Sequence, residues 1–157
     1  MENITRRKFI STTGVIAAGT AVGCVCGLGG CSAISKVGNT RHIQSDAYSI
    51  NNDVLHIDFS KEPELDTIGG SVKVIDDQLD DGLIIVRVEE NRFVAMSIYC
   101  THRQVEVEFD SQKNLFECAS FGSSRFGLDG DNLSGRAKEP LKAYEAKLEN
   151  EILLVTL

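Results

Sequence analysis

Two short segments, Cys100-Thr101-His102 and Cys118-Ala119-Ser120-Phe121, decide how the rest of this 157-residue chain is interpreted. Fifteen residues separate the two segments, and a strand-like run leads into each of them. Thiolate and imidazole groups are side chains that proteins use to bind transition metals. Cys100, His102 and Cys118 are therefore the candidate metal ligands. The pattern reads Cys-x-His, a loop, then Cys-x-x-Phe.

The residues around this pattern resemble the Rieske iron-sulfur family over roughly residues 96–146. Ser97-Ile98-Tyr99-Cys100-Thr101-His102 resembles the first cluster loop of the family, and Leu115-Phe116-Glu117-Cys118 resembles the strand that enters the second. The closing motif of the family is matched by Gly130, Gly135, Ala137, Pro140, Leu141 and Tyr144. The resemblance implies a 2Fe-2S cluster with two thiolates on one iron and two imidazoles on the other. It also implies a small all-β fold, an antiparallel β-sandwich with two cluster-binding loops.

One expected ligand is missing from the second loop. Phe121 stands where the family has its second histidine, and a phenyl ring has no lone pair to give a metal. The second iron then keeps only His102, because His42 and His56 lie far upstream. An oxygen from a nearby serine is a possible replacement, and the candidates are Ser120, Ser123 and Ser124.

Other departures also lie beside the ligands. Val105 and Ser120 stand where the Rieske subunits of cytochrome bc complexes carry an extra pair of cysteines, so the chain resembles the branch without that disulfide. The segment after Cys118 is one residue longer than usual, which leaves both Ser123 and Ser124 as candidates for the serine that bonds the cluster sulfide. Arg136 replaces a proline of the loop that covers the cluster.

Three hypotheses for the site follow. In the first, the protein is an electron carrier in which Cys100 and Cys118 hold one iron and His102 binds the other. In the second, the fold has lost its cluster and serves as a structural or docking subunit with a Cys100–Cys118 disulfide. In the third, the same three residues bind a single zinc ion with an open fourth position. None of the three implies an enzyme that is complete in one chain.

The start of the chain predicts export. Thr5-Arg6-Arg7-Lys8-Phe9-Ile10 resembles a twin-arginine signal, and an uncharged stretch follows as far as Ser35. Leu28-Gly29-Gly30-Cys31 fits a lipoprotein cleavage box with Cys31 as the lipidated residue. Alternatively the uncharged stretch spans the membrane uncleaved. Either way, we expect a protein anchored on the outer, or periplasmic, side of the cytoplasmic membrane.

The remaining sequence predicts one small domain. Residues 1–30 form the signal or anchor, residues 31–46 a polar tether, and residues 47–157 the Rieske-like domain. About 110 residues are enough for one modest core. The whole chain has a net charge of −7, and removing residues 1–30, which carry +2, leaves −9. This acidity argues against nucleic acid as a partner and favours a basic redox partner or complex, although it equally fits a surface that only maintains solubility.

Periodicity in the domain predicts strands and no helix. The strand-like runs are Val54 to Phe59, Ser71 to Ile75, Leu83 to Glu89, Phe93 to Ile98, Val105 to Phe109, Leu115 to Cys118, Ala143 to Leu148 and Ile152 to Thr156. Turn residues separate the paired runs, for example Ser111-Gln112-Lys113 and Glu149-Asn150. The sequence therefore predicts that the candidate loops extend from strand ends.

Overall fold

A computed structural model describes residues 40–120 and 124–157. These ranges contain twelve strands and two short 3₁₀ helices. The strands are β1 (Arg41–His42), β2 (Tyr48–Asn51), β3 (Val54–Asp58), β4 (Ser71–Val74), β5 (Leu83–Glu89), β6 (Arg92–Ser97), β7 (Val107–Asp110), β8 (Leu115–Cys118), β9 (Arg125–Phe126), β10 (Asn132–Ser134), β11 (Ala143–Glu149) and β12 (Ile152–Thr156), and the helices are η1 (Phe59–Lys61) and η2 (Pro63–Asp66). Neither helix in these ranges has the length and hydropathy that a membrane span requires.

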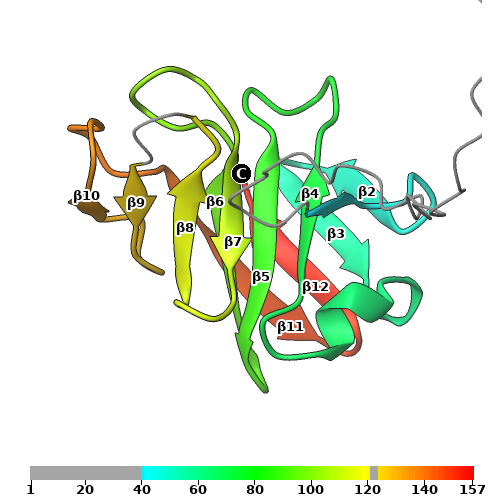
Figure 1. The fold of residues 1–157 in the computed structure, drawn as a ribbon. Coiled ribbons are helices and arrows are strands. Elements are labelled where there is room, and N and C mark those ends of the chain that lie inside the picture. The colour runs from blue at the N-terminus through cyan, green and yellow to red at the C-terminus, as the bar shows by residue number, and fades with distance from the viewer. Residues whose placement is uncertain (1–39, 121–123) are drawn as a thin grey trace, which may run out of the picture. The chain divides into compact units, whose positions relative to one another are not determined.

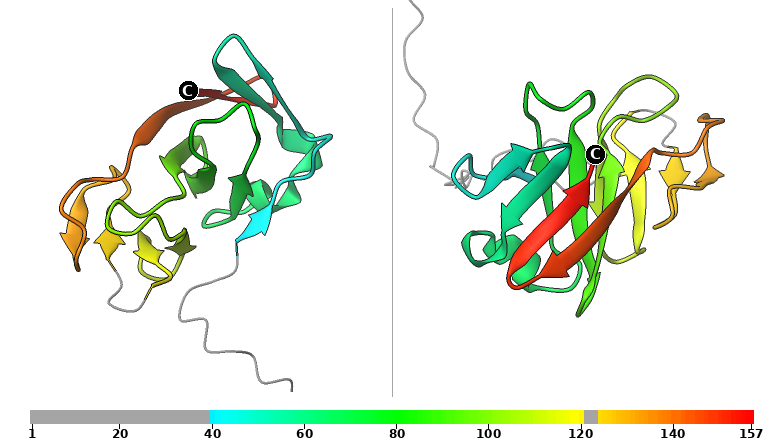
Figure 2. Two further views of the ribbon diagram at one scale, coloured as in Figure 1. Left: turned by 90° about the horizontal axis from the view of Figure 1, so that it is seen from above. Right: turned by 180° about the vertical axis from the view of Figure 1, so that it is seen from behind.

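The strands form two sheets (Figure 1). The larger sheet has the order β1-β4-β5-β6-β11-β12-β3-β2, and the smaller has the order β10-β9-β8-β7. Neighbouring strands are antiparallel except for β1 and β4, which are parallel. Seen from above, the larger sheet curves around, so that β5 and β6 lie between the small sheet and the β3–β12 pair (Figure 2). The predicted all-β sandwich is confirmed, with β1 as a parallel strand at one edge.

The central strand β5 is buried on both faces. Ile84 and Val86 pack against the small sheet, whereas Leu83 and Ile85 pack against β3 and β12. Successive side chains of a strand point to opposite faces, so a continuous apolar run is what a strand between two layers requires. The cluster that faces the small sheet also contains both candidate cysteine ligands. The site is therefore built on the edge of a packed core.

The predicted tether, residues 31–46, is too long at its C-terminal end. Residues 40–46 are joined to the domain, because β1 pairs with β4 and buried Glu62 binds this segment. The Glu62 carboxylate accepts hydrogen bonds from the Arg41 guanidinium at 2.8 Å and from the Gln44 N–H at 3.2 Å. The expectation of no helix also fails locally at η1 and η2, where Pro63 and an Asp58 side chain that accepts the Ser60 N–H favour tight turns.

A buried lysine connects β4 to β7. Lys73 Nζ lies 2.5 Å from Glu108 Oε1 and 2.7 Å from Glu106 Oε2, and Lys73 is only 2% exposed. Glu108 also accepts the Thr40 N–H at 2.9 Å. Burial lowers the pKa of Lys73, but the hydrogen bonds that Lys73 donates to Glu106 and Glu108 outweigh burial and raise the pKa overall, so the lysine stays charged. This charged cluster, Lys73-Glu106-Glu108, links β1 and β4 to the strand that follows the first candidate loop.

Replacing Gly70 with alanine is expected to destabilise the domain by about 3 kcal/mol, the upper end of the range for overpacking. A Cβ atom at Gly70 would lie 1.7 Å from the Glu64 carbonyl oxygen, so backbone must move. Gly127→Ala is the matched control, because its new Cβ meets the movable Asp129 carboxylate at 2.7 Å. Urea unfolding of both variants measures the difference. Equal stability of the two variants would contradict the assigned packing of η2 against β4.

Candidate metal centre

Cys100 lies in the hairpin loop between β6 and β7. Its N–H donates to the Val105 carbonyl at 2.8 Å, and its carbonyl accepts the Gln104 N–H at 2.8 Å. Gln104 has a φ of +55°, the left-handed conformation that closes such a turn. These backbone bonds hold residues 100–105, here named the first loop, in one conformation and fix the position of the Cys100 thiol.

Cys118 is the last residue of β8, where the second loop begins. Its N–H donates to the Ser124 carbonyl at 2.9 Å, which brings the two ends of the second loop together. The Ala119 N–H donates to the Glu106 carbonyl at 3.0 Å, and Glu106 also pairs with Tyr99. The second loop is therefore attached directly to the strand segment that follows the first. The first loop and the end of β8 lie at the same end of the small sheet (Figure 1).

The structure brings the Cys100 and Cys118 thiols together. Both side chains are buried and free, and they are hydrogen-bonded to each other. Cys118 Sγ also lies 3.1 Å from Ser120 Oγ. Burial raises the pKa of Cys100, and the neighbouring Cys118 raises it further. The Cys100 thiol is therefore uncharged unless a positive charge binds beside it.

Two donors point at the Cys100 sulfur and oppose the increase in its pKa. One is the backbone N–H of His102, and the other is the side-chain hydroxyl of Ser124. Donors of this kind stabilise a thiolate and lower the thiol pKa. They are also the contacts that a metal-bound cysteine needs, because outer hydrogen bonds to a ligand tune the metal. The surroundings of Cys100 therefore fit a thiolate ligand.

Ser124 is the main polar contact of the site. It is 2% exposed, and its Oγ accepts the Arg136 N–H at 3.1 Å and the Ala137 N–H at 2.9 Å while its hydroxyl donates to Cys100. The segment between β10 and β11, here named the covering segment, is thereby fixed over the thiols. The sequence leaves Ser123 and Ser124 as equal candidates for this role. Ser123 lies outside the described residues, and the partners of Ser124 come from another part of the chain.

The covering segment also contacts the first loop. The Thr101 hydroxyl donates to the Glu139 carbonyl at 2.8 Å. Gly130 and Gly135, before and within this segment, have φ values of +88° and +98°, which favour glycine. A side chain at Gly130 would also collide with the Leu141 carbonyl at 2.6 Å. The backbone conformation therefore explains why glycine stands at these two positions of the sequence motif.

His102 is half-buried in the turn of the first loop. Its side chain does not join the cysteines around one point, because no group of three or more His, Cys, Asp or Glu side chains in residues 40–120 and 124–157 is arranged to hold a single ion. A mononuclear zinc site requires such a group, so that hypothesis gains no support. A binuclear cluster does not require it, because its thiolates and imidazoles bind different irons. His42 lies on β1 and His56 on β3, away from both loops.

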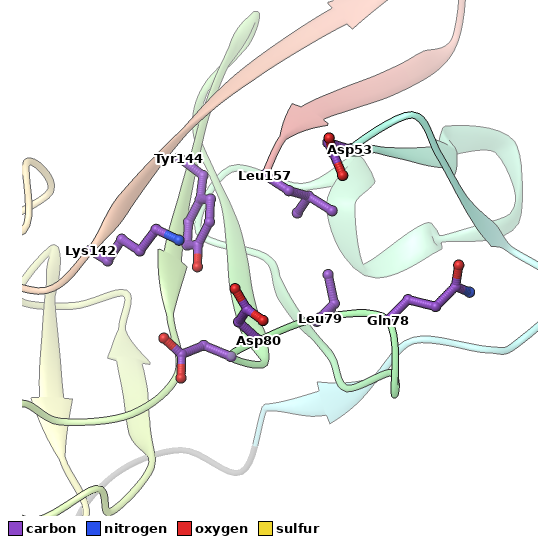
Figure 3. A pocket seen from close by; sticks show the side chains of 8 residues that line it. Asp53, Gln78, Leu79, Asp80, Lys142, Tyr144 and Leu157 are labelled. Atoms are coloured by element: carbon purple, nitrogen blue, oxygen red, sulfur yellow. The ribbon is translucent and has the colours of Figure 1, made fainter.

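Three residues of the candidate metal and lipidation sites lie outside the described part of the chain. They are Phe121, Ser123 and Cys31. Tyr144 lies on β11, half-buried against the core, and Lys142 Nζ lies 4.5 Å from the centre of its ring. Both line a cavity of about 300 Å³ with Asp53, Gln78, Leu79, Asp80, Asp81 and Leu157 (Figure 3). None of these lining residues belongs to the two candidate loops.

The donor set fits one half of a 2Fe-2S cluster better than the other. Cys100 and Cys118 are adjacent, buried and supplied with hydrogen-bond donors, as two thiolates on one iron require. The imidazole half has His102, and the position of a second histidine holds Phe121. The thiolate half is therefore complete, and the imidazole half is one ligand short.

Ser124→Ala is expected to reduce the free energy of unfolding by about 1–3 kcal/mol, the usual cost of leaving buried donors without a partner. The Arg136 and Ala137 N–H groups would lose their acceptor, and Cys100 would lose a donor. Ser134→Ala serves as the control, because Ser134 is exposed on β10. Urea unfolding compares the two variants. If both unfold at the same denaturant concentration, Ser124 does not hold the covering segment.

Comparison with known sequences gives one family match and related proteins. The family described as "Rieske [2Fe-2S] domain" matches residues 59–145. The protein named "Cytochrome b6-f complex iron-sulfur subunit" from Chlorobaculum tepidum is 30% identical over 95 residues, which is 60% of this chain and 51% of that protein. The protein of the same name from Chlorobaculum thiosulfatiphilum is 28% identical over 79 residues, which is 50% of this chain and 43% of that protein. The matched segment thus spans about half the length of each relative.

A solved structure supports the fold. The ferredoxin of carbazole 1,9a-dioxygenase from Nocardioides aromaticivorans IC177 superposes with a TM-score of 0.50. The two chains are 22% identical, and the match covers 59% of this chain and 91% of the ferredoxin. At this identity the likeness concerns the arrangement of strands alone.

Proposed function

This chain belongs to the Rieske [2Fe-2S] domain family, and from that membership we propose that it is a one-electron carrier, anchored to a membrane as a subunit or partner of a redox complex. The observation that carries the proposal is the pair of buried, mutually hydrogen-bonded thiols at the start of two joined loops. A 2Fe-2S cluster bound there would supply the exchange of single electrons. The named relatives, two cytochrome b6-f iron-sulfur subunits, support this class of function.

Each residue of the site has a defined task in this proposal. Cys100 and Cys118 act as thiolates for one iron, and His102 supplies an imidazole for the other. The Ser124 hydroxyl and the backbone N–H of His102 donate to the Cys100 thiolate and partly neutralise its negative charge. Lower negative charge at the ligand would favour reduction of a bound cluster. Imidazole ligands raise the potential, so a site with one imidazole fewer is expected to have a lower potential than a complete Rieske site.

The proposal also includes a location. The twin-arginine motif at Arg6-Arg7 supports export, and the box that ends at Cys31 supports a lipid anchor on the outer, periplasmic side. Because residues 1–39 lie outside the described structure, this part of the proposal rests on sequence alone. An uncleaved N-terminal membrane helix is the alternative anchor.

Cys31→Ser is expected to abolish lipid attachment to the mature protein. Cys24→Ser, which alters the weaker candidate box Ala21-Val22-Gly23-Cys24, should leave lipid attachment unchanged. The reason is that only a cysteine thiol directly after the cleavage site accepts the lipid. Incorporation of labelled palmitate in cells that express each variant measures the effect. Equal labelling of both variants, or none in the unaltered chain, would favour the uncleaved anchor.

Electron paramagnetic resonance of the full chain tests the electron-carrier proposal. We expect the reduced protein, purified without oxygen, to give a 2Fe-2S signal that integrates to one spin per chain. Cys118→Ser removes one thiolate and should eliminate that signal, whereas Ser134→Ala should retain it. An unaltered chain that gives no signal after anaerobic purification would contradict the proposal.

A second candidate function uses the same observation. Because the two thiols already lie in contact, oxidation would close a Cys100–Cys118 disulfide with little movement of the loops. The protein would then be a cluster-free docking or structural subunit. Mass spectrometry distinguishes this state, since the disulfide form contains two hydrogens fewer and binds no iron.

A further inference from the structure

The charge around the candidate site is opposite to that of the whole protein. The chain carries 23 acidic and 16 basic side chains, with a net charge of −7. In contrast, the first loop and the covering segment contribute four exposed basic residues, Arg103, Arg136, Lys138 and Lys142, and one exposed acidic residue, Glu139. Charge close to a docking site affects association more than distant charge, because salt screens long distances. Net charge is therefore a poor guide to the partner of this site.

Contacts in the backbone bring three of the four basic residues to one place. The Arg103 N–H donates to the Cys100 carbonyl, and the Arg136 N–H donates to Ser124 Oγ, which itself contacts Cys100. Lys138 precedes Glu139, whose carbonyl accepts the Thr101 hydroxyl. We name Arg103, Arg136 and Lys138 the basic rim. The rim therefore lies on the first loop and the covering segment, which meet beside Cys100.

The basic rim is available for a partner. None of its three side chains forms an ion pair with a residue of the described ranges, although ten such pairs occur there. Leu133, in the strand that leads to the covering segment, is 59% exposed. Exposed apolar and cationic side chains together are typical of contact surfaces between proteins.

Acidic residues lie beside the rim and limit how a partner can dock. The β4–β5 loop carries Asp76, Asp77, Asp80 and Asp81. It contacts the chain two residues before the first loop, where the Ile98 N–H donates to the Gly82 carbonyl. Lys142 Nζ lies over the Tyr144 ring, and its positive charge is also attracted by Asp81 and Asp80. Lys142 therefore already has partners within the domain. An acidic partner surface would be attracted by the rim and repelled by the adjacent loop. The positive rim and the negative β4–β5 loop together favour one orientation of the partner protein.

We propose that the basic rim is the docking surface for an electron-transfer protein that presents an acidic face. This inference rests on the proposed function. It replaces the expectation of a basic partner, which followed from net charge alone. The rim places that acidic face directly over the Cys100 and Cys118 loops, where the distance for electron transfer is shortest.

Two forms of one cytochrome c test the proposal. The native cytochrome is basic, and succinylation of its lysines makes the same haem protein acidic. Reduction of each form by the reduced full chain is followed at increasing ionic strength. We expect the acidic form to react faster at low salt and to lose that advantage as salt rises. Arg103→Glu should lower the rate at which the chain reduces the acidic cytochrome roughly three- to tenfold at low salt.

Arg92→Glu is the matched control, because it makes the same charge change on an exposed residue at the opposite end of β6 from Cys100. It should leave the rate with the acidic cytochrome nearly unchanged. A native cytochrome that reacts faster, or equal effects of the two variants, would overturn the proposal.

Binding is measured in parallel, so that failure of electron transfer can be told apart from failure of docking. Amide signals of the metal-free full chain are followed by NMR as each cytochrome is added. Broadening at Arg103, Arg136 and Lys138 by the succinylated form alone supports the docking surface, even if the chain carries no cluster. Broadening by the native form, broadening at the β4–β5 loop, or none at all contradicts it. Binding to anionic phospholipid vesicles that Arg103→Glu abolishes, without broadening by either cytochrome, would instead assign the rim to a membrane surface.

Discussion

Lys73→Met is expected to lower the free energy of unfolding by about 3–5 kcal/mol, the usual cost of leaving a buried charge without its partner. Lys73 Nζ binds Glu108 at 2.5 Å and Glu106 at 2.7 Å. The side chain of Glu108 is only 9% exposed, and the Thr40 N–H would be its remaining donor. The side chain of Glu106 is 42% exposed and can be solvated, so most of the cost arises at Glu108.

Urea unfolding of the full chain measures this change, and Lys147→Met provides the matched control. Lys147 pairs with Glu149 but is 68% exposed, so its loss should cost less than about 0.5 kcal/mol. The double variant Lys73→Met with Glu108→Leu should recover much of the loss, because no buried charge remains. If Lys73→Met were as mild as Lys147→Met, the buried charged cluster would not stabilise the fold.

The direction of the Lys73 pKa shift also predicts how the stability of the fold depends on pH. Its pKa is raised in the folded state, so its ion pairs stabilise the protein fully from neutral pH up to the ordinary lysine value. That stabilisation is lost only as the pH rises through the raised value. The difference between the unaltered chain and Lys73→Met should therefore stay constant from neutral to mildly alkaline pH.

Phe121→His is expected to strengthen iron binding at least about tenfold, because loss of outer contacts to a ligand alone costs about 10–100-fold in metal affinity. The substitution restores the lone pair that the family uses at this position and that phenylalanine lacks. The rate of iron release to a chelator measures retention. Phe121→Leu is the control, since it changes the same side chain without adding a ligand.

Nitrogen couplings give this prediction a direct structural readout. Electron spin-echo spectroscopy of the reduced protein should detect one coordinated imidazole in the unaltered chain, from His102, and two in Phe121→His. The Phe121→Leu variant should resemble the unaltered chain. Two imidazoles in the unaltered chain would mean that His42 or His56 reaches the cluster, contrary to their positions on β1 and β3.

The long strands were predictable because their patterns are local. β5, β8 and β12 have the predicted bounds, since each is an apolar or alternating run that ends at a turn. The two-residue strands β1 and β9 are too short for any periodicity, and the pairing of β1 with β4 depends on contacts thirty residues apart. The end of the tether was misplaced for the same reason.

The candidate site was predictable only in part. Spacing and resemblance singled out Cys100 and Cys118, and the fold brings their thiols together. The contacts of Ser124 could not be predicted from the sequence, because they depend on the covering segment. The basic rim was missed because net charge averages over the whole chain, whereas the fold gathers Arg103, Arg136 and Lys138 in one place.

Iron and acid-labile sulfide per chain, measured on the full protein purified without oxygen, test the central claim most directly. Two irons and two sulfides per chain are expected if Cys100, Cys118 and His102 hold a 2Fe-2S cluster. Neither iron nor sulfide, together with a Cys100–Cys118 disulfide, would contradict the electron-carrier account and establish a domain that has kept the fold without the cluster.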